Sequence, residues 1–308
     1  NGVPINDMEN GIVYWSNWAG LSDVASAIQV QRGLGSSKLA VSSVGGTINV
    51  VTRSADRSEG GFVSTSVGNN DYIKTLASYS TGLSESGWSG SFLFSRTAGD
   101  GYIDGTKFEG FNYFASVGYQ PNENHGLEFT VTGAPQWHHQ RSRASSIDAY
   151  IQYGGGEEPR IKYNEDWGFR NGEEYSFRRN FYHKPILSLN WDWTISDATK
   201  LTTTAYASFG RGGGTGEIGE INGRRQFALP RTNDGLIRVD DIFAYNSGQP
   251  VPDFGNDANP EGQRTLTDGI YLNQGNGDRS SANGITRRAS INSHNWFGVL
   301  SNLSNQLT

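Results

Sequence analysis

Cysteine is absent from the 308-residue sequence, which excludes disulfide frameworks and thiolate chemistry. Long hydrophobic runs are also missing, because no apolar stretch approaches the roughly 20 residues that a transmembrane helix needs. Charge is sparse as well: charged residues make up 18% of the chain and the formal net charge is −6, with no block of like charge. A weakly acidic chain of this kind argues against nucleic acid as a partner.

Glycine and aromatic residues, by contrast, are plentiful, with 41 glycines and an aromatic content of 12% beside only 35% hydrophobic residues. After about residue 60 the polarity of the side chains alternates with period two, so that Leu187, Leu189 and Trp191 oppose Ser188 and Asn190. Such alternation predicts strands with one apolar face. About eight segments, of lengths suited to strands that cross a membrane, show the pattern: 61–68, 72–80, 88–96, 111–120, 127–132, 185–193, 201–209 and 295–303.

The connections between these segments alternate between short and long. Short ones follow Ser80, Gln120 and Ile195, and the two longest are expected to span residues 134–179 and 211–292. This alternation is typical of outer-membrane barrels, which have short periplasmic turns and long external loops, whereas both ends of a soluble barrel meet water. We expect the long loops to form binding surface.

Aromatic residues gather where the strands meet the short turns. Tyr79, Trp88, Tyr119, Trp191 and Trp193 all lie at such strand ends, on the apolar face. An aromatic girdle at the membrane interface is expected in this position.

Two glycine-punctuated, β-prone stretches precede the first alternating segment: "VQRGLGSSKLA" at 30–40 and "SVGGTINVVTR" at 43–53. A phosphate-binding loop is excluded, because neither stretch contains Gly-Lys-Ser/Thr or opens an apolar helix. Gly45 and Gly46 allow backbone torsions that let the chain turn sharply into a strand. Two such strands before a barrel with a polar lumen indicate a plug.

With "NGVPIND" at 1–7, the segment 21–53 resembles the plug of TonB-dependent outer-membrane receptors, and the later strands are similar to those of Bacteroidota-type members. The resemblance implies an all-β membrane β-barrel with a small α+β plug domain inside its lumen. Residues 1–58 would be the C-terminal part of the plug, and 59–308 the first strands of the wall. The family's barrels have 22 strands around a plugged lumen. The chain is therefore expected to be a fragment without the TonB box, the first plug strands and the later barrel.

The resemblance also assigns candidate sites. Trp15, Asn17 and Trp18 would lie in the apical loop of the plug and bind ligand, although both tryptophans are equally able to pack against the wall. Arg32 would pair with wall carboxylates and lock the plug in place. The remaining motif positions are Gly33, Gly45, Gly46 and Asn49.

The function implied is energy-dependent uptake across the bacterial outer membrane of a scarce or large ligand such as a siderophore, cobalamin, glycan or peptide. The expected partners are TonB with its inner-membrane energising complex, outer-membrane lipid, the ligand, and a surface lipoprotein if the ligand is a glycan or peptide. No enzymatic motif, cofactor or metal site is expected, since the adjacent His138 and His139 point to opposite faces of an extended chain. Two alternatives stay open: a passive porin-like barrel and a soluble carbohydrate-binding β-sandwich.

Overall fold

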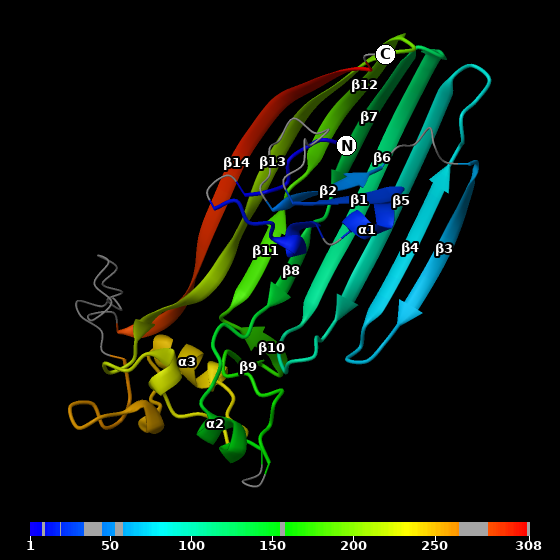
Figure 1. Cartoon of the computed structure of the whole chain (residues 1–308). Helices are drawn as coiled ribbons and strands as arrows, with labels where there is room; N and C mark the ends of the chain where they lie inside the picture. The colour runs from blue at the N-terminus through cyan, green and yellow to red at the C-terminus, as the bar shows by residue number, and fades with distance from the viewer. Residues whose placement is uncertain are drawn as a thin grey trace.

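The computed structural model contains one large antiparallel sheet, a small hairpin in front of it and a folded unit at one of its ends (Figure 1). It describes residues 1–7, 10–18, 20–33, 45–52, 58–154, 158–264 and 283–306. None of the helices in these ranges is long and apolar enough to cross a membrane.

The large sheet, called the wall below, has ten strands. Two pairs of them are each one interrupted strand, because β8 continues β7 after Pro135 and β12 continues β11 after Pro185, so eight strands cross the wall. The two edges are β3 and β14, and no described residue pairs one edge with the other. The bounds are β3 (Gly60–Val67), β4 (Ile73–Ser80), β5 (Trp88–Gly99), β6 (Phe108–Asn122), β7 (His125–Gly133), β8 (Gln136–His139), β11 (Arg179–His183), β12 (Ile186–Ser196), β13 (Thr199–Glu220) and β14 (Gly284–Asn305).

The two faces of the wall differ in polarity as the alternation predicts. Small polar side chains are buried on the concave face, among them Ser91, Ser116 and Ser188. Large apolar side chains stand exposed on the opposite face, including Phe92 and Leu189. The register places apolar residues opposite apolar residues, since Leu189 lies opposite Phe129 on β7 and Ala205 on β13. The predicted fold class, part of an antiparallel β-barrel wall with a small plug segment on its inner face, is confirmed.

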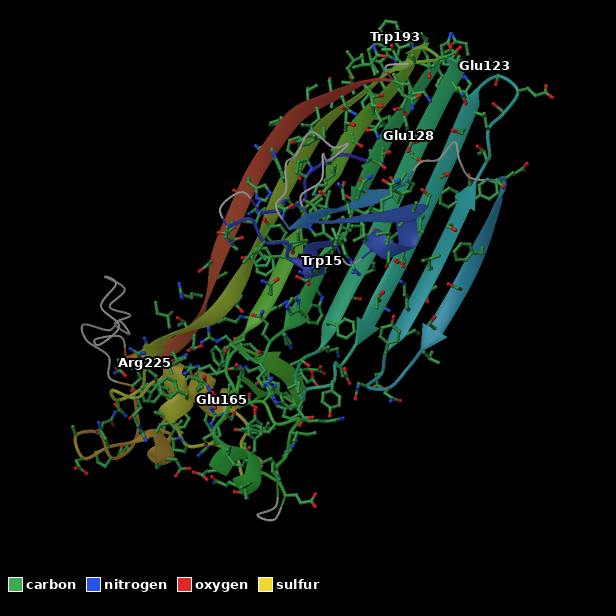
Figure 2. All side chains as sticks on the ribbon, in the orientation of Figure 1. Trp15, Glu123, Glu128, Glu165, Trp193 and Arg225 are labelled. Carbon is green, nitrogen blue, oxygen red and sulfur yellow. The ribbon has the colours of Figure 1, made fainter. Side chains whose placement is uncertain are left out.

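Aromatic rings stack at the end of the wall that carries the short turns. Trp88 lies 4.4 Å from Tyr119 between ring centroids, and Trp191 lies 5.6 Å from Trp193. Figure 2 shows Trp193 at the same end as Glu123, which belongs to the turn between β6 and β7. The predicted girdle positions are therefore confirmed as strand ends beside short turns.

The last two wall strands extend further than predicted. β13 continues to Glu220 and β14 begins at Gly284, so the second long loop starts after Glu220 rather than near residue 211. The first long loop likewise starts after His139 rather than near residue 134, because β8 adds residues 136–139 to the wall. The prediction was too short because it followed apolar alternation. The backbone ladder continues beyond the last apolar pair, through the glycines 212–214 that face Tyr182, Phe181 and Asn180 of β11.

The described parts of the long loops fold together into a unit that we call the cap, residues 140–154, 158–178 and 221–264. It contains α2 (Ile147–Gln152), β9 (Trp167–Arg170), β10 (Glu173–Ser176), η2 (Gln226–Ala228), α3 (Val239–Asn246) and η3 (Pro252–Phe254). A buried apolar cluster joins both loops to the start of β14: Phe177, Ile221, Leu229, Ile237, Val239, Ile242, Tyr245, Val251, Phe254 and Ile285. The loops that we expect to form binding surface are thus supported by a hydrophobic core of their own.

The hairpin in front of the wall corresponds to the predicted plug segment. It comprises η1 (Trp15–Trp18), α1 (Leu21–Val24), β1 (Ala27–Arg32) and β2 (Gly46–Val51). Within the described residues β1 and β2 pair only with each other. Figure 1 shows them crossing in front of the wall strands, on the side of the sheet where α1 meets β4 and β5.

Candidate functional site

A polar seam joins the plug to the concave face of the wall. Asp23 of α1 forms an ion pair with Lys74 of β4 at 2.6 Å and accepts a hydrogen bond from Ser95 of β5 at 3.2 Å. Asn112 of β6 donates from Nδ2 to the carbonyl oxygen of Gly20 at 3.1 Å. A Cβ atom on Gly20 would lie 1.9 Å from the Asn112 side chain, so this close approach requires glycine.

An apolar seam lies beside the polar one. Val24 of α1 is buried in a cluster with Leu76, Leu93 and Phe114, three wall residues that face the plug. Phe114 is a large apolar residue on the face that also buries Asn112 and Ser116, and this contact is the reason. Sequence reasoning missed Asp23 and Val24 as docking residues, although large apolar side chains on a lumen face were the available signal.

A small cavity of about 180 Å³ separates the first residues of the plug from the wall. Its lining combines apolar groups such as Ile5 and Ile186 with the predicted site residues Trp18 and Asn49. Asn1 closes one side, where its side chain bonds to Thr52 and its carbonyl oxygen accepts from the Thr204 hydroxyl of β13 at 3.2 Å. The cavity thus lies between two contacts of the plug with the wall.

The predicted apical residues form the short helix η1. Trp15 is 57% exposed, whereas Asn17 and Trp18 are half-buried. Figure 2 shows Trp15 on the side of the hairpin nearer the cap. The two tryptophans therefore differ: Trp15 is open to solvent, and Trp18 faces the wall, where the Nζ atom of Lys184 lies 5.5 Å from its ring centroid.

Lys184 interrupts the strand formed by β11 and β12 and is only 6% exposed. Its Nζ atom also lies 4.8 Å from the ring centroid of Trp296 on β14. No hydrogen bond or ion pair joins this ammonium group to any described residue, and Asp7 is the carboxylate whose charge acts on it. Sequence reasoning missed Lys184, although counting back from Ser188 in steps of two places it on the lumen face.

Two rings next to Lys184 lie over glycines of β13. His294 occupies the space above Gly210, where a Cβ atom would lie 2.3 Å from the imidazole, and Tyr182 occupies the space above Gly212. The Tyr182 hydroxyl lies 3.3 Å from Nδ1 of His294. Nε2 of His294 is buried without a hydrogen-bond partner.

The predicted motif residues lie in and around the hairpin. The Gly33 amide donates to the carbonyl of Gly45 at 3.4 Å, and Asn49 donates to Gln29 at 3.0 Å. Gly46 has φ +127°, and a Cβ atom there would lie 2.4 Å from the carbonyl oxygen of Gln31. Residues 34–44 and 53–57, which complete the quoted motifs and the link to the wall, lie outside the described residues.

Arg32, predicted to lock the plug to the wall, ends β1 with an exposed side chain. It forms no ion pair with any residue that the structure describes. The hydrogen bonds and the ion pair that join the plug to the wall are made by Gly20, Asp23 and Asn1.

An ion pair and a hydrogen bond tie the two loops of the cap together. Arg170 binds Asp240 at 2.7 Å, and this bond together with the Asn171 amide holds the pKa of the Asp240 carboxyl below its usual value. Tyr163 donates its hydroxyl to the carbonyl of Gly235, and burial raises the pKa of Tyr163 to about 12. Within the described part of the chain, no three His, Asp or Glu side chains are placed to hold a metal ion.

No model of a known protein family matches the sequence, and no curated protein matches it. Solved structures do match. The ferric-catecholate import receptor Fiu of E. coli K12, in its closed form, has a TM-score of 0.50 and 12% identity, over 92% of this chain and 34% of Fiu. FpvA of P. aeruginosa, bound to a heterologous pyoverdine and iron, has a TM-score of 0.51 and 12% identity, over 72% of this chain and 27% of FpvA. The likeness concerns the fold, and this chain spans 34% or less of either receptor's length.

Proposed function

We propose that the chain belongs to an outer-membrane receptor that captures a ligand outside the cell and imports it through its lumen. One observation carries the proposal: a folded plug segment is docked on the polar, concave face of a sheet whose other face is apolar. The apolar face suits lipid, and the polar face suits a lumen. The cap at one end of the wall and the exposed Trp15 supply the surfaces for capture.

Transport requires the plug to move, because α1 and Asn1 hold it across the concave face. The energy would come from TonB and its inner-membrane complex, and the ligand would pass without covalent chemistry. Iron chelates are the first ligands to test, since Fiu imports a ferric catecholate and FpvA binds a pyoverdine with iron. Cobalamin, glycans and peptides are the next, and a surface lipoprotein would accompany the last two.

The two alternative functions fit the contacts less well. A passive porin-like barrel has no need of a plug held by an ion pair and an apolar cluster. A soluble carbohydrate-binding sandwich would bury the large side chains of both its sheets, whereas Phe94 and Phe297 stand exposed beside other apolar side chains.

The capture role of η1 is tested by replacing Trp15 and Trp18 together with Ala in the protein purified from outer membranes in detergent. We expect affinity for ferric chelates to fall about tenfold or more, the loss that follows removal of well-packed aromatic anchors. Assembly of the wall should not change, because its stability comes from the strand ladder. The matched control is Trp88→Ala, a tryptophan with similar exposure on the convex face at the other end of the wall.

The result also separates capture from packing. If both tryptophans only pack against the wall, the double variant will keep its affinity while passive leakage through the lumen rises. Recovery of the protein in a soluble fraction without detergent would contradict the membrane assignment itself.

A further inference from the structure

A groove of about 460 Å³ runs along β13 on the convex face of the wall, the face turned away from the plug. Ala205 and Ala207 form its floor, because their side chains are short. Larger side chains lie opposite them on both neighbouring strands, namely Leu187 and Leu189 on β12 and Phe297 and Val299 on β14. The groove therefore has the shape and the polarity that suit a narrow apolar body such as an acyl chain.

The same row of β13 ends in a positive charge toward the cap. Phe209 follows Ala207 in this row and packs against Phe297 with ring centroids 5.6 Å apart. Arg211 comes next on the same face, and its side chain is exposed. It forms no ion pair with any residue that the structure describes. The apolar groove thus leads without a break to a free guanidinium group.

A second arginine lies in the same hollow, a space of about 320 Å³ lined by Arg211, Arg179 and Phe181 among others. Arg179 of β11 stacks over the ring of Trp137, with its guanidinium carbon 4.2 Å from the ring centroid. Its Nε atom is buried without a hydrogen-bond partner. The Arg179 amide donates to Thr215, four positions beyond Arg211 on β13, so about 13 Å of strand separates the two arginines.

The carboxylate of this hollow does not neutralise the two arginines. Glu109 binds Arg96 at 2.7 Å and accepts a hydrogen bond from Nε1 of Trp137 at 3.3 Å. Neither Arg179 nor Arg211 forms an ion pair with it. The hollow therefore keeps two positive charges that an anion can approach from the convex side.

The distances along β13 match the dimensions of a membrane. Leu201, beside a short turn, and Arg211 are separated by about 34 Å of strand. At the tilt of about 35–45° usual in such walls, this strand spans about 25 Å, the height of the apolar band of an outer-membrane barrel. If Leu201 lies at one boundary of the band, Arg211 lies at the level of the headgroups on the cap side. The groove at Ala205 and Ala207 then lies about 10–15 Å deeper.

We propose that this surface binds one glycolipid of the outer leaflet, with two phosphate groups on its headgroup. The phosphates pair with Arg179 and Arg211, and one acyl chain lies in the groove over Ala205 and Ala207. The guanidinium fork binds two phosphate oxygens at once, and two separated arginines suit two phosphates better than the single phosphate of a phospholipid. The inference rests on the proposed function in taking the convex face to meet the membrane and the cap to lie outside the cell.

The first test adds lipid A, a glycolipid with two phosphates, to the protein in detergent and measures bound lipid by native mass spectrometry. We expect one lipid to bind, and the double variant Arg179→Gln/Arg211→Gln to bind it about tenfold or more weakly, because two charge-assisted contacts are lost. Arg288→Gln is the control, since it removes an exposed arginine from the other face of β14. Equal affinity in the double variant would overturn the proposal.

The second test fills the groove and leaves both arginines in place. Ala207→Leu puts a larger side chain on the floor of the groove, so lipid A should bind about tenfold or more weakly than to the wild-type protein. Ala115→Leu is the control, because this exposed alanine lies on the convex face of β6 outside the groove. Unchanged affinity in Ala207→Leu would contradict the place of the acyl chain.

Other lipids decide which chemistry the surface recognises. Lipid A stripped of its phosphates should bind weakly, and so should phosphatidylglycerol, which carries one phosphate. Binding of either one as tightly as lipid A would show that the surface does not recognise paired phosphates, and the proposal would be wrong. A protein that binds ferric chelates but not lipid A would refute this inference and leave the proposed function standing. Recovery in a soluble fraction without detergent would remove both.

Discussion

The cap and the wall use the same large side chains with opposite exposure. In the cap, Phe254 and Tyr245 have no exposed surface, whereas Phe92 and Phe297 of the wall are 53% and 64% exposed. Conversely, serines such as Ser91 and Ser208 are buried in the wall. The cap has the interior of a water-soluble domain, and the wall has the reverse. If the convex face meets a bilayer, as the proposed function requires, exposure marks a side chain as dispensable in the cap and as necessary in the wall.

The largest effect is expected inside the cap. Phe254→Ala removes a fully buried ring that packs with Ile242 and Val251, at a cost of about 3–5 kcal/mol. We expect residues 221–264 to become sensitive to protease while the wall keeps its resistance to heat in detergent. Phe227→Ala is the control, since that ring is 42% exposed on the same unit. Melting of the wall together with the cap would show that the two unfold as one cooperative unit, which would contradict the claim that the cap has a separate core.

Two exposed aliphatic residues, one in the wall and one in the cap, test whether the two surfaces meet different solvents. Leu189 of the wall is 45% exposed and Ile161 of the cap is 63% exposed. Leu189→Arg should cost about 2–4 kcal/mol of folding free energy in bilayers if the residue lies near midplane. Ile161→Arg should stay within about 0.5 kcal/mol, as surface substitutions in water do. Equal effects, measured by urea titration in vesicles, would mean that the convex face does not meet lipid.

The smallest effect is expected at the seam, where the wall buries apolar groups as the cap does. Asp23→Asn and Lys74→Met each remove one partner of the ion pair that holds α1. In a double-mutant cycle the two should couple by about 1–3 kcal/mol, as residues in direct contact do. Hydrogen exchange of the amides of residues 21–24 measures the cycle. Purely additive effects would show that the pair does not hold the plug.

The wall could be predicted from the sequence because its rule is local. Alternation in one strand, as in Leu187 to Trp193, determines which face each side chain takes, and the aromatic rings mark the turn end. The prediction failed where that signal stopped, at the ends of β13 and β14 nearest the cap. There the ladder continues on backbone hydrogen bonds, which leave no trace in hydrophobic periodicity.

The cap and the surroundings of Lys184 could not be predicted in the same way. The cap's core joins residues such as Phe177 and Val251, far apart in the chain and surrounded by turn-forming residues. Lys184 lies near the rings of Trp18 and Trp296, which come together only after the plug has docked. Sequence motifs located the hairpin, but the contacts that hold it belong to Asp23 and Val24, which no motif singles out.

The rings that lie over glycines of β13 have an evolutionary consequence. His294 fills the space above Gly210, and Tyr182 fills the space above Gly212, so each glycine is half of a pair that spans two strands. A larger residue can replace the glycine only if its ring partner becomes smaller in the same lineage. Among homologous sequences these positions should therefore change together, and that correlated change would trace the neighbourhood of Lys184 without any ligand being known.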